Sequence, residues 1–160
     1  MKVALITLSD RAYQGLYKDL STPNLERWLA DHGVTHLIKE LISDDRDQLM
    51  DSFRILLNQN LDVILTCGGT GISSRDITPD VTKEIIEKEI PGVTELIRSQ
   101  NKHPMSPLSR AICGSIRKTL ILNLSGSPQG AVEQIEVAWP ILLHACTILK
   151  RDGVSGSPCD

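Results

Sequence analysis

The chain has 160 residues, of which 41% are hydrophobic and 23% charged, and its formal net charge is −3. This length allows one well-formed hydrophobic core and is short for two, and the composition is that of an ordinary soluble globular domain. The sequence has no cluster of five or more basic residues, so it lacks the positive surface that nucleic-acid binding requires, and we do not expect it to bind nucleic acid.

Strand-like and helix-like segments alternate along the chain. Residues 2–8 form a continuous apolar run rich in residues that favour strands and predict a buried strand, and further strands are predicted at 36–42, 61–66 and 119–124. Because Val, Ile and Leu dominate these runs, we expect a sheet that is buried on both faces.

Helices are predicted between these strands. Thr22-Pro23 and Thr78-Pro79 each supply a helix N-cap followed by a proline in the first turn, and Asp45 with Gln48 resembles a capping box. Further helices are predicted over about residues 93–100, 108–115 and 130–149, the last of them kinked or restarted at Pro140.

This alternation predicts an α/β fold, a three-layer αβα sandwich with a mostly parallel sheet. Residues 1–152 are expected to form a single domain, and the small, polar residues 153–160 a frayed tail. The apolar N-terminal run is too short for a signal peptide, and the near-apolar stretch 137–149 is interrupted by a proline and a histidine, so no membrane span is expected. The four cysteines have neither metal-binding nor disulfide-framework spacing, which fits a cytoplasmic location.

Polar residues gather where three of the predicted strands end. Ser9-Asp10-Arg11, Asp44-Asp45 and the long segment Thr66–Asp80 each follow a strand directly. Because ligands in open α/β sheets bind beyond the carboxyl ends of the strands, these three loops indicate one site.

The segment Gly68-Gly69-Thr70-Gly71 is the most informative of these loops. Glycines permit positive φ and close approach of a ligand, and successive N–H groups in such a loop bind anions. The segment matches neither a Walker A loop, since Gly-Lys-Ser/Thr is missing after it, nor the dinucleotide fingerprint, since the third glycine is missing. The alternative is an ordinary turn between a strand and a helix.

Asp76 and Asp44 are candidates for holding a metal ion. A carboxylate beside bound phosphates is repulsive unless a cation lies between them, and Mg²⁺ takes one or two carboxylates together with substrate phosphates. Either aspartate could instead stabilise the start of the helix that follows it. Asp76 would do so through the helix dipole and Asp44 as a cap. Asp45 is better placed as the cap, which leaves Asp44 freer for function.

Three arginines stand in loops or at helix starts rather than on the faces of long helices. Arg11, Arg75 and Arg110 could each offset the charge of a triphosphate. Taken singly, each is more commonly a solvated surface residue.

Together, these motifs resemble the Mog-type molybdenum cofactor biosynthesis family, the MoaB/Mog domain that also forms the N-terminal domain of gephyrin. The resemblance covers nearly the whole chain. It is carried by residues 6–12 with 15–19, by the glycine-rich signature Thr66–Asp80, by Leu108-Ser109-Arg110, and by the segment 120–128 that ends in Ser125-Gly126-Ser127-Pro128. The opening loop with Gly15 and Tyr17 is more similar to the Mog branch than to the MoaB branch.

The resemblance implies adenylyl transfer from ATP to molybdopterin, with Mg²⁺, giving adenylyl-molybdopterin and pyrophosphate. It implies catalytic, metal-assisting roles for Asp44 and Asp76, and a homotrimer with a molybdenum-insertion protein as a further partner. The residues expected to bind substrate or nucleotide are Ser9, Asp10, Arg11, Gly68, Gly69, Thr70, Gly71, Arg75, Ser109, Arg110, Gly126 and Ser127.

The chain departs from the family pattern at three positions. Ser125 replaces a usual proline, Gln129 a common lysine and Cys67 a common threonine. These changes bear on pterin affinity and on the branch more than on the reaction class. Two alternatives stay open: a carrier that holds molybdopterin without adenylylating it, and a nucleotide-hydrolysing enzyme on the same scaffold.

Overall fold

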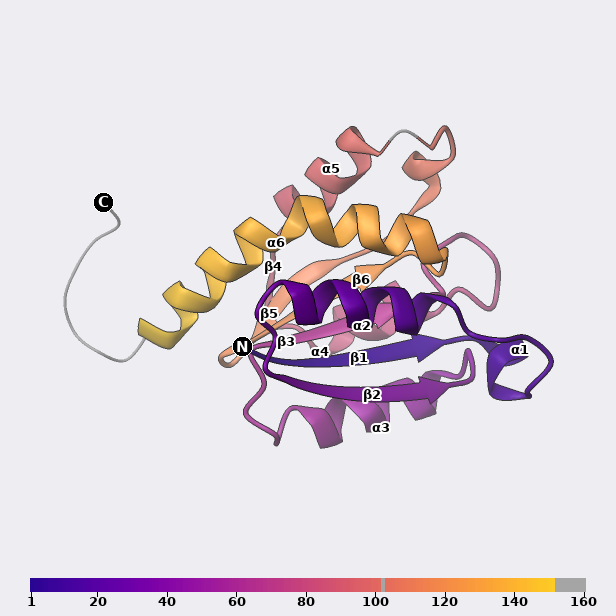
Figure 1. Ribbon diagram of the computed structural model, residues 1–160, viewed down its shortest axis with the longest axis horizontal. Helices are drawn as coiled ribbons and strands as arrows, with labels where there is room; N and C mark the ends of the chain where they lie inside the picture. The colour runs from indigo at the N-terminus through magenta and orange to yellow at the C-terminus, as the bar shows by residue number, and fades with distance from the viewer. Residues whose placement is uncertain (102, 152–160) are drawn as a thin grey trace.

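The computed structural model describes residues 1–101 and 103–151, and a six-stranded sheet with the strand order β2-β1-β3-β6-β5-β4 forms its centre (Figure 1). The four strands β2, β1, β3 and β6 run parallel, whereas β5 runs antiparallel to both of its neighbours. The predicted αβα fold with a mostly parallel sheet is confirmed. The strands are β1 (Lys2–Leu8), β2 (His36–Ile42), β3 (Val63–Cys67), β4 (Lys88–Glu89), β5 (Cys113–Ile116) and β6 (Thr119–Leu124).

Helices cover both faces of the sheet (Figure 1). On one face lie α2 (Ser21–Asp31), α5 (Pro91–Gln100) and α6 (Pro128–Arg151), and on the other lie α3 (Arg46–Leu56) and α4 (Thr78–Ile85). The short α1 (Asp10–Tyr13) follows β1 directly, and a 3₁₀ turn, η1 (Ser106–Leu108), precedes β5.

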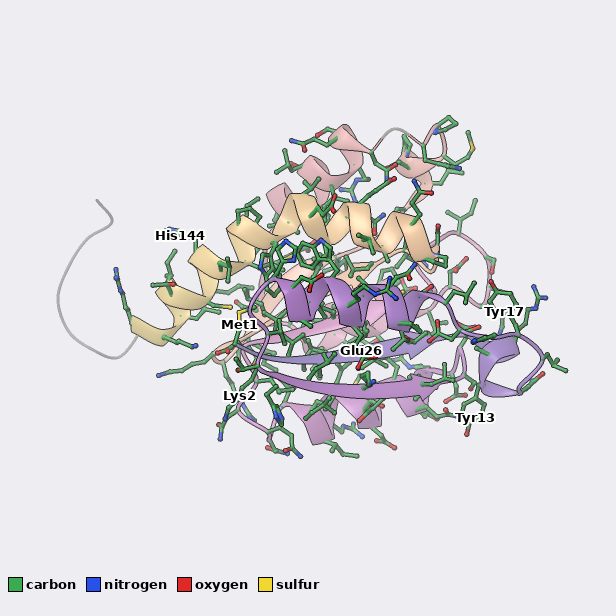
Figure 2. The ribbon with its side chains drawn as sticks, viewed as in Figure 1. Met1, Lys2, Tyr13, Tyr17, Glu26 and His144 are labelled. Carbon is green, nitrogen blue, oxygen red and sulfur yellow. The ribbon has the colours of Figure 1, made fainter. Side chains whose placement is uncertain are left out.

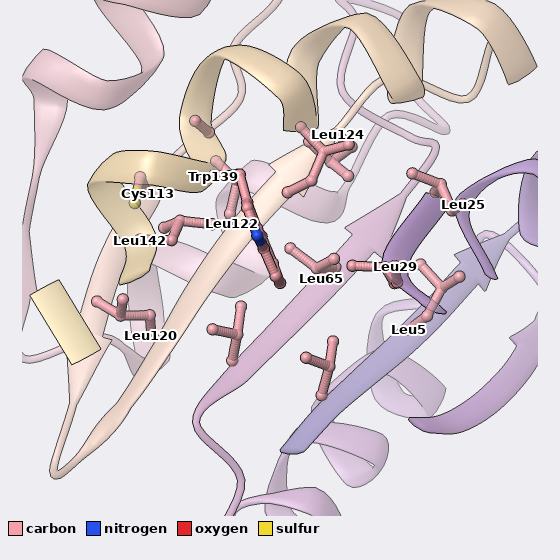
Figure 3. Packing of buried hydrophobic residues seen from close by; sticks show 14 of the residues in the cluster. Leu5, Leu25, Leu29, Leu65, Cys113, Leu120, Leu122, Leu124, Trp139 and Leu142 are labelled. Atoms are coloured by element: carbon pink, nitrogen blue, oxygen red, sulfur yellow. The ribbon is translucent and has the colours of Figure 1, made fainter. Parts of the chain in front are cut away.

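Alternation along the strands divides the core into two layers. Leu5 and Leu65 point towards α2 and α6, where they meet Leu25, Leu29 and Trp139 (Figure 3). The alternate residues of the same strands point to the opposite face of the sheet, where Phe53 of α3 is fully buried. Period-two alternation with both faces apolar is the pattern expected of a sheet covered by helices on both sides.

By length and composition alone, helix α6 is long and apolar enough to cross a membrane, although it contains a proline and a histidine. Its inner residues, among them Ile135, Trp139 and Leu142, are buried against the sheet. It is therefore a partly buried core helix. The helix is continuous through Pro140 and changes direction near its middle (Figure 1).

The prediction of a helix over residues 108–115 is wrong. Residues Ser106–Leu108 form only a single 3₁₀ turn, and Cys113–Ile116 is a strand that pairs antiparallel with β6. A short apolar run does not distinguish a helix from a strand, and the turn at Arg117, with φ of 52°, joins the two strands as a tight hairpin. The predicted frayed tail, residues 153–160, lies outside the described residues.

Two of the three predicted helix caps are also wrong. Thr22 lies in the first turn of α2, whose N-cap residue is Leu20. The Oδ1 of Asp19, just before that residue, accepts the N–H groups of Ser21 at 2.8 Å and Thr22 at 3.2 Å. Thr78 is the first residue of α4 and uses its hydroxyl elsewhere. Asp45 is the N-cap of α3 as predicted, since its side chain accepts the N–H of Gln48 at 2.9 Å.

A nearly buried aspartate joins three segments at the amino-terminal edge of the sheet. Asp62 is 9% exposed, and its carboxylate accepts the backbone N–H of Lys2 at 2.8 Å and pairs with Lys150 of α6 at 2.6 Å. Burial alone would raise the pKa of Asp62, but the Lys150 ammonium and the Lys2 N–H outweigh it and lower that pKa. The ionised side chain therefore stabilises the fold.

We predict that Asp62→Ala lowers the free energy of unfolding by about 1–3 kcal/mol at pH 7, because the Lys2 N–H loses its acceptor. The contribution is present above the ordinary aspartate pKa and is lost as the pH falls through the lowered folded-state value. Urea denaturation of both proteins from pH 7 to pH 3 should therefore show the difference shrinking. Asp51→Ala, which removes an exposed pair with Arg54, is the control and should have little effect; equal losses for the two variants would contradict the assignment.

Candidate functional site

A pocket of about 230 Å³ lies at the carboxyl ends of β1, β3 and β6. This is the point where the chain order of the strands reverses, with β2 on one side of β1 and β3 on the other. Tyr17, at this end of the strands, lies at the opposite end of the molecule from Met1 and Lys2 (Figure 2). The pocket is lined by Thr7, Leu8, Ser9, Ala12, Tyr17, Asp19, Ser21, Asp44, Cys67, Gly68, Gly69, Arg75, Asp76 and Gly126.

The glycine loop enters the pocket at Gly68 and Gly69, both of which have positive φ, +112° and +62°. A Cβ atom at Gly68 would lie 2.3 Å from the carbonyl oxygen of Leu8, and one at Gly69 would lie 2.5 Å from the Thr78 hydroxyl. Glycine is therefore required at both positions, for conformation and for space. The sequence-based prediction of positive φ is confirmed at these two positions, and the close approach of a ligand stays a prediction.

A buried polar network holds this loop from behind. The Thr78 hydroxyl donates to the carbonyl of Gly68 at 2.9 Å, and the Asn123 amide donates to the hydroxyls of Thr66 and Thr82 at 2.9 Å each. All four of these side chains are fully buried. Because buried polar groups are costly when unpaired, the network fixes the loop relative to β3, β6 and α4.

The backbone amides of the loop are not equivalent. The Gly68 N–H donates to the carbonyl of Leu124 at 3.1 Å, so it serves the fold. Among residues 1–101 and 103–151, the N–H groups of Gly69, Thr70, Gly71 and Gly126 have no protein acceptor. Gly69 and Gly126 line the pocket, so their amides are the donors available to an anion there.

Arg110 lies behind the loop rather than in the pocket. Its guanidinium donates to the carbonyls of Gly71 at 2.7 Å and Asp76 at 2.5 Å and pairs in a bidentate manner with Asp80. Ser109 and Arg110 instead line a second hollow of about 450 Å³ together with Lys83 and Arg98. The arginine therefore joins the two ends of the segment that follows Gly71.

Two aspartates at neighbouring strand ends are bound to each other's backbone. The N–H of Asp10 donates to the carboxylate of Asp44 at 2.9 Å, and the N–H of Asp44 donates to the carboxylate of Asp10 at 3.0 Å. Arg75 reaches across from the glycine loop and pairs with Asp10 at 2.7 Å. The three predicted loops are thus connected directly.

Acidic charge dominates the pocket. Its lining includes the carboxylates of Asp19, Asp44 and Asp76, and its one basic side chain, Arg75, is already paired with Asp10. Burial raises the pKa of Asp44, and the nearby charges of Asp10 and Asp76 raise it further. The Arg75 guanidinium lowers the pKa of Asp10. An anion entering this pocket needs a cation beside it.

The carboxylates of the pocket fit Mg²⁺, which also takes ligands from water and substrate, better than they fit a metal ion that only protein side chains coordinate. Within the described part of the chain, no group of three or more His, Cys, Asp or Glu side chains is arranged to hold a metal ion. Mg²⁺ characteristically binds one or two carboxylates and takes its other oxygen ligands from water and substrate phosphates. Asp44 and Asp76, both at the pocket wall, supply that number of carboxylates.

The structure brings about half of the predicted site residues into one pocket. Asp10 adjoins the pocket through Asp44 and Arg75, and Arg11 lies on the surface with its guanidinium 5.4 Å from the centre of the Tyr17 ring. The predicted residues that line the pocket are Ser9, Asp44, Gly68, Gly69, Arg75, Asp76 and Gly126; those outside its lining are Asp10, Arg11, Thr70, Gly71, Ser109, Arg110 and Ser127.

Several lining residues carried no role in the sequence-based prediction. Tyr17 and Asp19 stand in the loop after α1, and Ser21 donates its hydroxyl to the Gly126 carbonyl at 2.9 Å. Asp19 could have been found from its position ahead of Ser21-Thr22, where an aspartate caps a helix. Tyr17 stood out in the sequence only through the similarity of its loop to the Mog branch, which gave it no part in the site.

Comparisons with known proteins show what the sequence and the fold are similar to. Residues 4–144 match the family model described as "Probable molybdopterin binding domain". A molybdopterin adenylyltransferase of Haemophilus influenzae is 39% identical over 142 residues, 85% of this chain and 72% of the relative. One from Helicobacter pylori is 34% identical over 92% of this chain and 86% of the relative. The solved structure of the molybdopterin biosynthesis enzyme MoaB from Thermus thermophilus matches with a TM-score of 0.86 and 38% identity over 92% of this chain and 95% of that one.

We predict that Gly68→Ala lowers the free energy of unfolding by about 2–4 kcal/mol, because a side chain there is strained and collides with the Leu8 backbone. Urea unfolding followed by circular dichroism measures the effect. Gly92→Ala, in the first turn of α5 where a Cβ meets nothing within 4 Å, is the matched control and should be neutral or slightly stabilising. The same stability for both variants would show that the close approach at Gly68 is not required.

Proposed function

The chain belongs to the Mog/MoaB family of molybdopterin-binding proteins of molybdenum cofactor biosynthesis, and from this premise we propose that it transfers the adenylyl group of ATP to molybdopterin. The observation that carries the proposal is the position of Asp44 and Asp76 in one pocket with the open amides of Gly69 and Gly126. The curated relatives of Haemophilus influenzae and Helicobacter pylori bear the name of this activity.

In the proposed reaction, an oxygen of the molybdopterin phosphate attacks the α-phosphorus of ATP. The bond from the α-phosphorus to the oxygen bridging to the β-phosphate breaks, and pyrophosphate leaves with that electron pair. Such transfers require mainly positioning and charge neutralisation. The chain needs no nucleophile of its own, and burial disfavours the thiolate of Cys67, the cysteine that lines the pocket, because it raises the pKa of that thiol to about 12.

Each element of the pocket has a part in this scheme. Asp44 and Asp76 would hold Mg²⁺, which when bound offsets the negative charge of the phosphates. The N–H groups of Gly69 and Gly126 donate to phosphate oxygens, and Arg75 supplies a positive charge at the rim. Ser9 contributes a hydroxyl at the same edge.

We extend the proposal to the setting in which the protein works. We propose a cytoplasmic homotrimer that passes its product to a molybdenum-insertion protein. The three cysteines in the described part of the chain are free, which agrees with a reducing compartment.

Pyrophosphate release separates the proposed activity from its alternatives. The protein is incubated with ATP and Mg²⁺, with and without molybdopterin. Release that depends on the pterin supports adenylyl transfer, whereas release without the pterin would show a nucleotide hydrolase. No release in either case, with the pterin bound, would identify a carrier.

We predict that Asp76→Asn leaves molybdopterin binding intact but lowers the rate of pyrophosphate release about a hundredfold or more, because one carboxylate for the cation is lost. Steady-state kinetics and a separate pterin-binding titration measure the two effects. Asp51→Asn, on the exposed side of α3, is the control of the same chemistry. A rate for Asp76→Asn within about twofold of wild type would remove this residue from the mechanism.

A further inference from the structure

The loop Ser125-Gly126-Ser127 follows β6 and brings Gly126 to the pocket wall. Side chains from three other elements hold its backbone. The Ser125 N–H donates to Oε1 of Gln134 at 2.7 Å, the Cys67 thiol donates to the Ser125 carbonyl at 3.1 Å, and the Ser21 hydroxyl donates to the Gly126 carbonyl at 2.9 Å. The peptide groups on both sides of Ser125 are therefore fixed.

Gln134 differs from Cys67 and Ser21, the other two residues that bind this backbone, because it does not line the pocket. It lies in the second turn of α6 and is only 6% exposed. A buried glutamine is costly unless its amide is hydrogen-bonded, and the Ser125 N–H is the donor that its oxygen receives. The Gln134 side chain thus connects the core helix α6 to the loop at the site.

Gly126 transmits this contact to the rest of the pocket. A Cβ atom at Gly126 would lie 3.2 Å from the Cα of Gly68, so the loop after β6 is packed directly on the glycine loop. The Gly126 N–H has no protein acceptor among the described residues. The peptide group that carries this N–H also contains the Ser125 carbonyl, which accepts the Cys67 thiol, and Gln134 fixes the peptide group just before it through the Ser125 N–H.

We propose that Gln134 is a positioning residue, which holds the Ser125 N–H and thereby aims the Gly126 N–H at a phosphate of the bound nucleotide. The identity of that ligand rests on the proposed function, whereas the effect of Gln134 on the loop does not. Gln134 itself touches no substrate.

The proposal predicts an energetic coupling between Gln134 and Ser125. In Gln134→Leu, the Ser125 N–H is left without its acceptor, and we expect the KM for MgATP to rise about tenfold with a smaller change in kcat. In Ser125→Pro, the N–H is removed and the Gln134 oxygen loses its donor. In the double variant neither polar group remains unpaired, so its KM should return to within about threefold of that of Ser125→Ala.

Three further variants isolate the contact. Ser125→Ala removes the hydroxyl that accepts the Ser127 N–H but keeps the Ser125 N–H, so it is the baseline for the proline variants. Gln134→Glu keeps an oxygen acceptor in the same place and should bind MgATP nearly as wild type does, which provides a folded variant if Gln134→Leu is unstable. Gln100→Leu makes the same exchange at an exposed position of α5 and should change nothing.

Hydrogen exchange of the Gly68 amide, measured without ligand, reads the loop independently of the reaction, because its acceptor is the Leu124 carbonyl in the same peptide group as the Ser125 N–H. We expect exchange of this amide about tenfold faster in Gln134→Leu and restored protection in the double variant. Additive effects of the two substitutions, in exchange or in KM, would overturn the proposal. Coupled exchange in a protein whose wild type releases no pyrophosphate would retain the positioning role and reject the proposed reaction.

Discussion

Acidic side chains surround a loop whose free backbone amides suit an anion. The rest of the site depends on this opposition between negative side chains and an anion-binding loop. Asp19, Asp44 and Asp76 share one pocket wall, while the single arginine there is paired with Asp10. Burial raises the pKa of Asp44, and the charges of Asp10 and Asp76 raise it further. We therefore expect a phosphate to occupy such a pocket together with a cation, and our proposal of a metal-assisted nucleotide reaction depends on this expectation.

The fold creates the crowding. Parallel strands end at the same edge of the sheet, so the residues that follow β1, β2, β3 and β6 meet there although they are far apart in the chain. Positive φ at Gly68 allows the loop to turn against the Leu8 carbonyl, and Arg110 holds its far end through the carbonyls of Gly71 and Asp76. The buried Asn123 network then joins this loop to the core, so the sheet holds the site in place.

Much of this could be predicted from the sequence, because the strongest signals are local. The segments 2–8, 36–42 and 119–124 coincide with the bounds of β1, β2 and β6. In β1 and β6 the cause is burial on both faces, which leaves a nearly uninterrupted apolar pattern, whereas the edge strand β2 is only partly buried. The pattern failed at β5, where the partner strand and not the local spacing decides the structure. The convergence of Asp44, Asp76 and the glycine loop followed from strand order.

Other parts of the site depend on three-dimensional contacts that a single sequence does not show. Arg110 and Ser109 stood among the expected lining residues, but the fold of the segment after Gly71 places them on the second hollow. Gly68 was expected to offer its amide, but β6 uses it through Leu124. The link from Gln134 to Ser125 joins residues nine positions apart by a side-chain bond that no motif describes.

The central claim, that this pocket accepts phosphates only with a cation, is tested most directly by calorimetric titration of ATP into the wild-type protein. Titrations in Mg²⁺ and in excess EDTA compare the two states without any requirement for turnover. We predict an affinity at least about tenfold weaker in EDTA, and a much smaller difference when Asp44 and Asp76 are both replaced by asparagine. Equal affinity of the wild-type protein for ATP in both conditions would contradict the claim.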